Sequence, residues 1–119
     1  LMVDPILIRH ALFNLLLNAA QAAGGDDPII ISLEPGTDPE GDAAGWWLAV
    51  TDCGKVIPPE VLEKVFVPFF TTRSDGTGLG LPVVQHVALL HGGHVSAASA
   101  PVSGTRFALW LPILQSGTA

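Results

Sequence analysis

The sequence predicts an α+β fold of two layers, in which a mixed β-sheet is covered by helices on one face. The four segments with the apolar pattern of strands come in adjacent pairs instead of alternating singly with helices. With 119 residues and 49% hydrophobic content, the chain can bury one core but is too short for two domains of ordinary size. We therefore expect a single domain over residues 1–119.

The first predicted element is a helix over residues 4–23, "DPILIRHALFNLLLNAAQAA". Asp4 suits the N-cap, because its side chain can accept hydrogen bonds from free amides, and Pro5 suits the first helical position. Gly24 and Gly25 are typical of a helix end.

Periodicity and turn residues predict the other elements. We expect strands over 28–36 and 45–52, an acidic solvated loop over 35–45, a short helix over 58–66, a glycine-containing loop over 67–80, a helix over 79–93 that stops at its final glycines, and strands over 94–100 and 105–113. The sequence contains no internal repeat and no low-complexity tract.

Charge and cysteine content exclude several classes of function. The formal net charge is −6, and six of the eleven acidic residues lie within residues 26–42, so the basic surface of a nucleic-acid-binding protein is missing. The single cysteine, Cys53, excludes an internal disulfide. The apolar runs are too short and interrupted to span a bilayer. We expect a cytoplasmic domain without direct membrane contact, whose parent protein can still be membrane-anchored.

The start of the chain indicates a piece of a larger protein. It begins "LMVDP", without an initiator methionine, and "LMV" has the character of the end of a strand. We expect a C-terminal fragment that lacks further domains.

A row of polar residues follows one side of the first helix. Asn14, Asn18 and Gln21 are separated by four and three residues, and His10 lies one turn earlier. An ordinary amphipathic helix also has an exposed polar side. Short carboxamides are unusual there, however, and an amide oxygen is a suitable ligand for Mg²⁺ held together with phosphates.

Three glycines precede the predicted helix over 79–93. In "SDGTGLGLP", Gly76, Gly78 and Gly80 would let the backbone approach an anion, and the helix N-terminus would present free amides to it. Such a loop can equally be a simple turn, and it matches neither a P-loop nor a dinucleotide-binding fingerprint.

An aspartate, Asp52, ends the strand "GWWLAVTD" and is followed two residues later by Gly54. A carboxylate at the end of a buried strand needs hydrogen-bond donors. It can accept from the exocyclic amine of adenine, with Gly54 admitting the ring, or it can cap a turn.

The order and spacing of these motifs resemble one known family. The matching segments are "NLLLNAAQA" at 14–22, Asp52 with Gly54, "VFVPFFTTR" at 65–73, "GTGLGL" at 76–81, and the closing "HGG" and "GTRFALWLP". They are similar to the N box, first glycine box, F box, second glycine box and closing strands of the catalytic ATP-binding domain of bacterial sensor histidine kinases. That domain belongs to a superfamily that also contains gyrase B, a heat-shock chaperone and mismatch-repair ATPases. The resemblance implies the Bergerat-type fold of that superfamily.

The resemblance also implies roles for individual residues. Asn18 would bind Mg²⁺, Asn14 the magnesium-phosphate group and Asp52 adenine, while Arg73 would contact phosphate. Asn14 and Arg73 are thus the candidate catalytic residues. The remaining residues expected to bind ATP are Gly54, Thr72, Gly76, Thr77, Gly78, Leu79 and Gly80.

Asn14 stands where the ATPase branches of the superfamily carry a glutamate base. An amide cannot take a proton from water at neutral pH, so phosphoryl transfer is favoured over hydrolysis. In sensor kinases the acceptor histidine lies on a helical dimerisation domain and is followed by an acidic residue. None of the four histidines here (His10, His86, His91, His94) has an acidic residue next. The expected partners are therefore a separate dimerisation and phosphoacceptor domain and a downstream response regulator, and the fragment alone should not autophosphorylate.

Two alternatives remain open at the level of sequence. Val56 occupies a position where the first glycine box usually has a second glycine, which favours a docking module that has lost its nucleotide. A serine kinase of the anti-sigma-factor type would have the same fold. The F box and the N-terminal truncation favour the sensor kinase over it.

Overall fold

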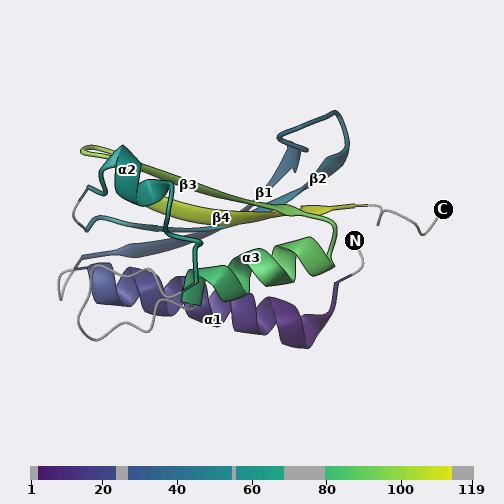
Figure 1. Cartoon of the computed structure of the whole chain (residues 1–119), viewed down its shortest axis with the longest axis horizontal. Helices are drawn as coiled ribbons and strands as arrows, with labels where there is room; N and C mark the ends of the chain where they lie inside the picture. The colour runs from purple at the N-terminus through teal and green to yellow at the C-terminus, as the bar shows by residue number, and fades with distance from the viewer. Residues whose placement is uncertain (1–2, 24–26, 55, 69–79, 114–119) are drawn as a thin grey trace.

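The computed structural model describes residues 3–23, 27–54, 56–68 and 80–113. Figure 1 shows two layers, with the strands in one and the helices α1 and α3 in the other. The elements are α1 (Pro5–Ala22), β1 (Ile29–Thr37), β2 (Ala44–Asp52), α2 (Pro59–Leu62), α3 (Gly80–Leu90), β3 (His94–Ala100) and β4 (Gly104–Pro112).

The strands lie in the order β1-β2-β4-β3, so β2 and β4 form the centre of the sheet. The α+β class with helices on one face is confirmed. Within the described residues, however, all neighbouring strands are antiparallel, not the mixture that the pattern predicted. The strands of each consecutive pair run antiparallel, and the two inner strands also meet in opposite directions.

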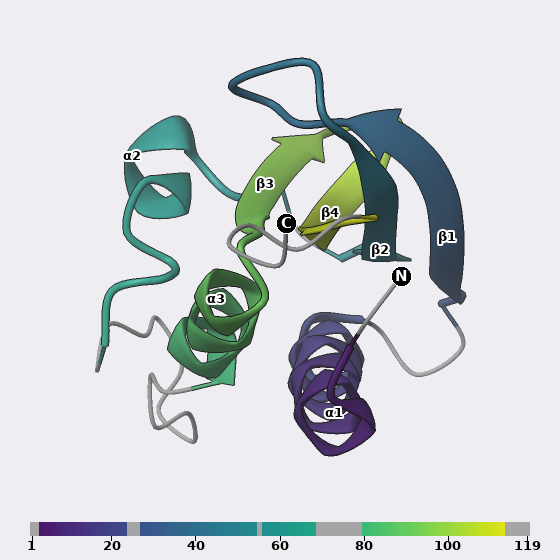
Figure 2. The ribbon, with the colours of Figure 1, turned by 90° about the vertical axis from the view of Figure 1, so that its right-hand side faces the viewer.

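Both long helices cover the same face of the sheet (Figure 2). They run side by side beneath β2, β3 and β4, and the core lies between the two layers. Small residues at Ala11, Ala19 and Ala88, each at most 1% exposed, allow the helices to lie close to their neighbours. Larger core side chains are Leu15, Val50, Val84, Phe107 and Leu109.

Helix α1 begins as the sequence predicts. Asp4 is the N-cap, and its Oδ1 accepts from the backbone amides of Ile6 at 2.9 Å and Leu7 at 3.3 Å. The helix ends at Ala22, and the glycines predicted to stop it lie outside the described residues. Although α1 is long and mostly apolar, no helix among the described residues has the length and hydropathy needed to cross a membrane.

One predicted loop and one predicted helix are shorter in the structure than the sequence indicates. The loop expected over 35–45 is shorter, because Pro35 pairs opposite Trp46 and strand pairing continues to Thr37. Pro35 is tolerated because β1 is an edge strand. The helix expected over 58–66 contains only Pro59–Leu62, and hydrogen-bonded turns follow it.

Trp110 organises the face of the sheet away from the helices. The tip of the β1–β2 hairpin curls over this face, and the Trp110 indole Nε1 donates to the Gly36 carbonyl at 3.0 Å. The His94 ring lies 5.8 Å from the Trp110 ring, and His94 Nε2 is 3.1 Å from Asp38 Oδ1. These contacts explain why Trp110 is only 1% exposed on a face that carries no helix.

We predict that Trp110→Phe lowers the free energy of unfolding by about 1–2 kcal/mol, since it removes the bond to Gly36 along with part of the ring contact. Urea unfolding followed by circular dichroism measures this loss. Trp46→Phe, the same substitution on the opposite face of the sheet, is the control and should cost less. Equal losses in both variants would contradict a specific role for the indole bond.

Candidate functional site

Asn14 lies where the two helices meet. Its Nδ2 donates to the His10 carbonyl at 2.9 Å, which directs the amide group along α1. The Asn14 Oδ1 would lie 3.3 Å from a Cβ placed on Gly80, the first residue of α3. The carbonyl oxygen of the asparagine is therefore beside the N-terminus of the helix that follows the glycine-rich segment.

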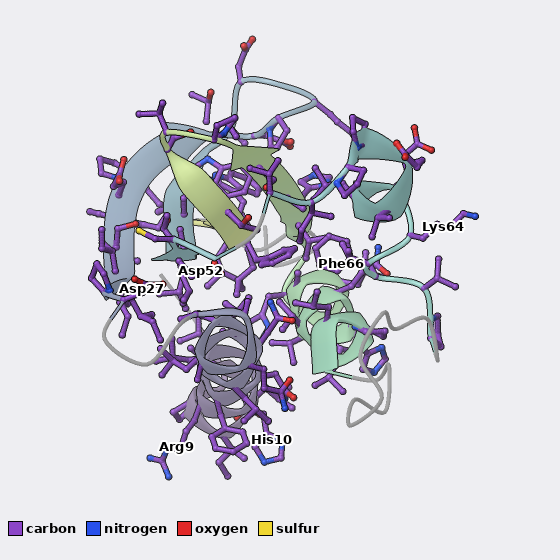
Figure 3. All side chains as sticks on the ribbon, turned by 90° about the vertical axis from the view of Figure 1, so that its left-hand side faces the viewer. Arg9, His10, Asp27, Asp52, Lys64 and Phe66 are labelled. Carbon is purple, nitrogen blue, oxygen red and sulfur yellow. The ribbon has the colours of Figure 1, made fainter. Side chains whose placement is uncertain are left out.

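Asn18 lies one turn further along α1, on the same flank as Asn14, and it is half-buried. His10 belongs to the predicted polar row, but it is exposed and points away from the sheet (Figure 3). Gln21 is also exposed. The structure therefore brings Asn14 and Asn18 to the flank nearest α3 and leaves the two ends of the predicted row toward solvent.

Asp52 is the last residue of β2 and is only 1% exposed. Figure 3 shows it between the sheet and α1. Its Oδ1 accepts from the Gly54 amide at 2.8 Å, whereas its Oδ2 is buried without a hydrogen-bond partner among the described residues. Since buried polar atoms are nearly always paired, Oδ2 marks a position suited to an external donor.

Gly54 follows the end of β2 and lies directly against the end of α1. A Cβ on Gly54 would lie 2.5 Å from the Ala22 carbonyl oxygen and 2.9 Å from Asp52 Oδ1. No other residue type fits this approach without movement of the backbone. The predicted glycine is thus required by packing, and its close approach holds Asp52 near the helix that carries the asparagines.

Thr105 is a site residue that the motif search did not single out. It lies opposite Asp52 in the β2–β4 register and is 2% exposed. Its Oγ1 is 2.7 Å from Ser99 Oγ, which also accepts from the Ile57 amide at 2.9 Å. The Gly-Thr pair at the start of a buried strand was the signal in the sequence that could have indicated Thr105. The position of Thr105 beside Asp52, however, depends on the order of the strands in the sheet.

Gly104 permits this arrangement by its backbone conformation. Its φ is +82°, and a Cβ would lie 2.2 Å from the Asp52 carbonyl oxygen. Glycine adopts positive φ without steric cost. The start of β4 can therefore lie directly against the end of β2.

Val56 was the residue where the family pattern breaks. Its side chain is 47% exposed, and the next amide, that of Ile57, is bonded to Ser99. Cys53 is exposed. The segment after Asp52 is thus hydrogen-bonded to β3 at the residue that follows Val56.

Most of the expected phosphate-binding residues lie outside the described part of the chain. They are Thr72, Arg73, Gly76, Thr77, Gly78 and Leu79. Of that segment the structure describes Gly80, beside Asn14. Among the described residues, no group of three or more His, Cys, Asp or Glu is placed to hold a metal ion.

Comparison with known proteins assigns the chain to a family. Residues 3–115 match the model of the "Histidine kinase-, DNA gyrase B-, and HSP90-like ATPase" family, which is nearly the whole chain. The chain belongs to this family. Its members bind ATP, and the chain matches the histidine kinase branch of the family in sequence as well as in fold.

The similar proteins are sensor kinases of two-component signal transduction. The chain is 43% identical over 110 residues to sensor histidine kinase ZraS of Escherichia coli O157:H7, and 36% identical over 114 residues to the histidine-protein kinase AtoS of Escherichia coli K12. These alignments cover 92% and 96% of this chain but only 23% and 18% of those proteins. The chain therefore spans less than a quarter of the length of these curated relatives.

Solved structures agree with the fold. The mycobacterial sensor histidine kinase MprB superposes with a TM-score of 0.77 at 33% identity, covering 92% of this chain and 72% of that one. The catalytic domain of histidine kinase ThkA also gives 0.77 at 33% identity, with coverage of 92% and 68%. The arrangement of helices and sheet is thus that of histidine kinase catalytic domains.

We predict that Gly54→Ala destabilises the domain by about 1–3 kcal/mol, because the new Cβ meets the Ala22 carbonyl. Chemical denaturation measures the change. Gly41→Ala is a matched control, since its added Cβ would find its nearest atom at 3.8 Å, an ordinary contact distance. A Gly54→Ala variant as stable as Gly41→Ala would show that the end of α1 does not lie against Gly54.

Proposed function

We propose that this domain binds Mg²⁺-ATP and supplies its γ-phosphoryl group to a histidine on a separate helical dimerisation domain, with a response regulator downstream. The observation that carries the proposal is the buried Asp52 Oδ2, which lacks a partner among the described residues and lies near the end of the helix that carries Asn14 and Asn18. Family membership supports the nucleotide, since the matching family is one of ATPases.

Asp52 suits adenine because its two oxygens have different surroundings. Oδ1 is occupied by the Gly54 amide, which fixes the orientation of the carboxylate. Oδ2 is left to accept from the exocyclic amine of the base, and the Thr105 hydroxyl lies on the adjacent strand. A buried acceptor that is left unpaired is costly, so a ligand with an amine is favoured over one with a carbonyl at this position.

The phosphates would lie toward the meeting point of α1 and α3. Asn18 is the proposed Mg²⁺ ligand, and Asn14 would hold the magnesium-phosphate group beside Gly80. Bound Mg²⁺ would supply neutralisation of the charge on the phosphate oxygens. Arg73 and the loop glycines Gly76 and Gly78 are proposed as further phosphate contacts.

The residues favour transfer over hydrolysis. Asn14 stands where an ATPase would need a general base, and its amide is already engaged with the His10 carbonyl. Neither nitrogen nor oxygen of a carboxamide accepts a proton at neutral pH. Phosphoryl transfer requires mainly positioning and electrostatic stabilisation, which such groups can provide.

The phosphoacceptor is proposed to lie in another domain. His91 is buried with both ring nitrogens bonded, and His94 is adjacent to Asp38. His10 and His86 are exposed, but neither is followed by an acidic residue. The isolated chain should therefore bind nucleotide without phosphorylating itself.

Titration with a non-hydrolysable ATP analogue, with and without Mg²⁺, tests the proposal. We predict that Asn18→Ala reduces the affinity for the Mg²⁺ complex about tenfold or more and the affinity for the metal-free analogue much less, since Asn18 contacts the cation. Gln21→Ala, on the exposed side of the same helix, is the control. Equal losses would mean that Asn18 is not the ligand, and absence of binding by the unmodified domain at millimolar analogue would favour the nucleotide-free docking module that Val56 suggests.

We predict that Asp52→Asn folds but loses at least about tenfold in affinity for the ATP analogue, because an amide at this position can place a donor against the amine of adenine. The remaining carbonyl oxygen can still accept the hydrogen bond from the Gly54 amide, so the free energy of unfolding measured in urea should change little. Calorimetric titration gives the affinity. Retention of full affinity in a folded Asp52→Asn variant would remove the proposed adenine contact.

A further inference from the structure

His91, directly after α3, is a buried histidine with both ring nitrogens bonded to the backbone. It is 5% exposed. Its Nε2 is 2.9 Å from the Asp4 amide nitrogen, and its Nδ1 is 2.8 Å from the Val87 carbonyl oxygen. An amide can only donate and a carbonyl can only accept, so the ring is neutral, with its proton on Nδ1.

The partner of His91 is the N-cap of the other long helix. Asp4 uses its side chain to accept from Ile6 and Leu7, while its backbone amide donates to the imidazole. One residue therefore begins α1 and also joins it to the end of α3. The contact spans 87 positions of sequence, so it is a purely tertiary link.

A second contact lies between the middle of α1 and the first residue of α3. Asn14 lies ten residues after Asp4, and Gly80 lies eleven residues before His91, where a Cβ on Gly80 would lie 3.3 Å from Asn14 Oδ1. At 1.5 Å per residue these separations are both about 15–17 Å. The helices are antiparallel, and the two contacts bracket their shared interface.

Between these contacts the buried residues of both helices are apolar. They are Ala11 on α1, and Leu81, Val84, Val87 and Ala88 on α3. Apolar burial is non-directional, so by itself it defines no single distance between one atom of α1 and one of α3. A hydrogen bond has a defined distance and angle, so the His91 contact is suited to set the register of the pair.

We propose that His91 is a positioning residue for the nucleotide site: by bonding the N-cap of α1, it fixes the α1–α3 register that keeps Asn14 beside Gly80. The inference rests on the proposed function for its effect on ATP. Its structural content, the dependence of the Asn14–Gly80 contact on a residue at the opposite end of α3, does not require nucleotide.

Two substitutions at His91 separate the hydrogen bond from the volume of the side chain. His91→Gln keeps an acceptor oxygen at the reach of Nε2, whereas His91→Leu has a similar volume without an acceptor. We predict that His91→Leu weakens binding of the Mg²⁺ complex of the ATP analogue about fivefold or more, the equivalent of one hydrogen bond, while His91→Gln stays within about twofold.

Trp47→Ala controls for a general loss of stability. Trp47 lies next to Leu48, which packs in the core, so its side chain is on the face of the sheet away from both helices. The Trp47→Ala substitution should lower the free energy of unfolding. It should not change the affinity for the ATP analogue under conditions where the variant is folded. Unfolding curves of all variants allow affinities to be compared where each protein is folded.

Nuclear magnetic resonance supplies a readout that does not need ligand. Long-range correlations of the imidazole should show the His91 proton on Nδ1. The Gly80 amide and the Asn14 carboxamide signals should shift in His91→Leu, but not in His91→Gln or Trp47→Ala.

The possible results separate the two proposals. If the unmodified domain binds the analogue and His91→Leu binds as well as His91→Gln, the positioning role is overturned while the function stands. If the unmodified domain does not bind, the proposed function is overturned, and unchanged Asn14 and Gly80 signals in His91→Leu would overturn the register claim separately.

Discussion

The pairing of β2 with β4 is the interaction on which the rest of the structure depends. These strands belong to different hairpins, and they meet in the centre of the sheet with Val50 opposite Phe107 and Asp52 opposite Thr105. The same register therefore places apolar side chains on the face against which both helices pack, and polar side chains at the end of β2 in the candidate site. Because side chains alternate between faces, a shift of one residue would turn Asp52 and Val50 away from the helices together.

The site lies where apolar packing ends. The core between the layers is continuous through Leu15, Val84 and Leu109. Asp52 lies at the margin of this core, where one carboxylate oxygen is hydrogen-bonded and the other has no partner among the described residues. Such a carboxylate is costly in an empty apolar surrounding and is suited to a donor that arrives with a ligand. In the proposed function, the bond from the Gly54 amide would hold this carboxylate in place before ATP binds, which would lower the entropic cost of binding.

Much of this arrangement was predictable from local patterns. The N-cap at Asp4 and the strand over 45–52 follow from residue types and spacing, because capping and strand alternation involve residues close in sequence. Other features were not accessible in this way. The antiparallel direction of the whole described sheet, the strand character of Pro35–Thr37 and the site position of Thr105 depend on which strand lies beside which. No local signal carries that information.

The sequence by itself determined the elements, their order, and the residue types that can hold a nucleotide and a hard cation: two carboxamides on one helix, a strand-end carboxylate, and glycines before a second helix. It did so because helix and strand periods, caps and donor chemistry are properties of short segments. Only the tertiary structure decided that Gly54 lies against Ala22, that Thr105 lies opposite Asp52, and that His91 bonds the start of α1. Each of these contacts joins residues far apart in the chain, so its geometry is set by the packing of whole elements and by the pairing of strands.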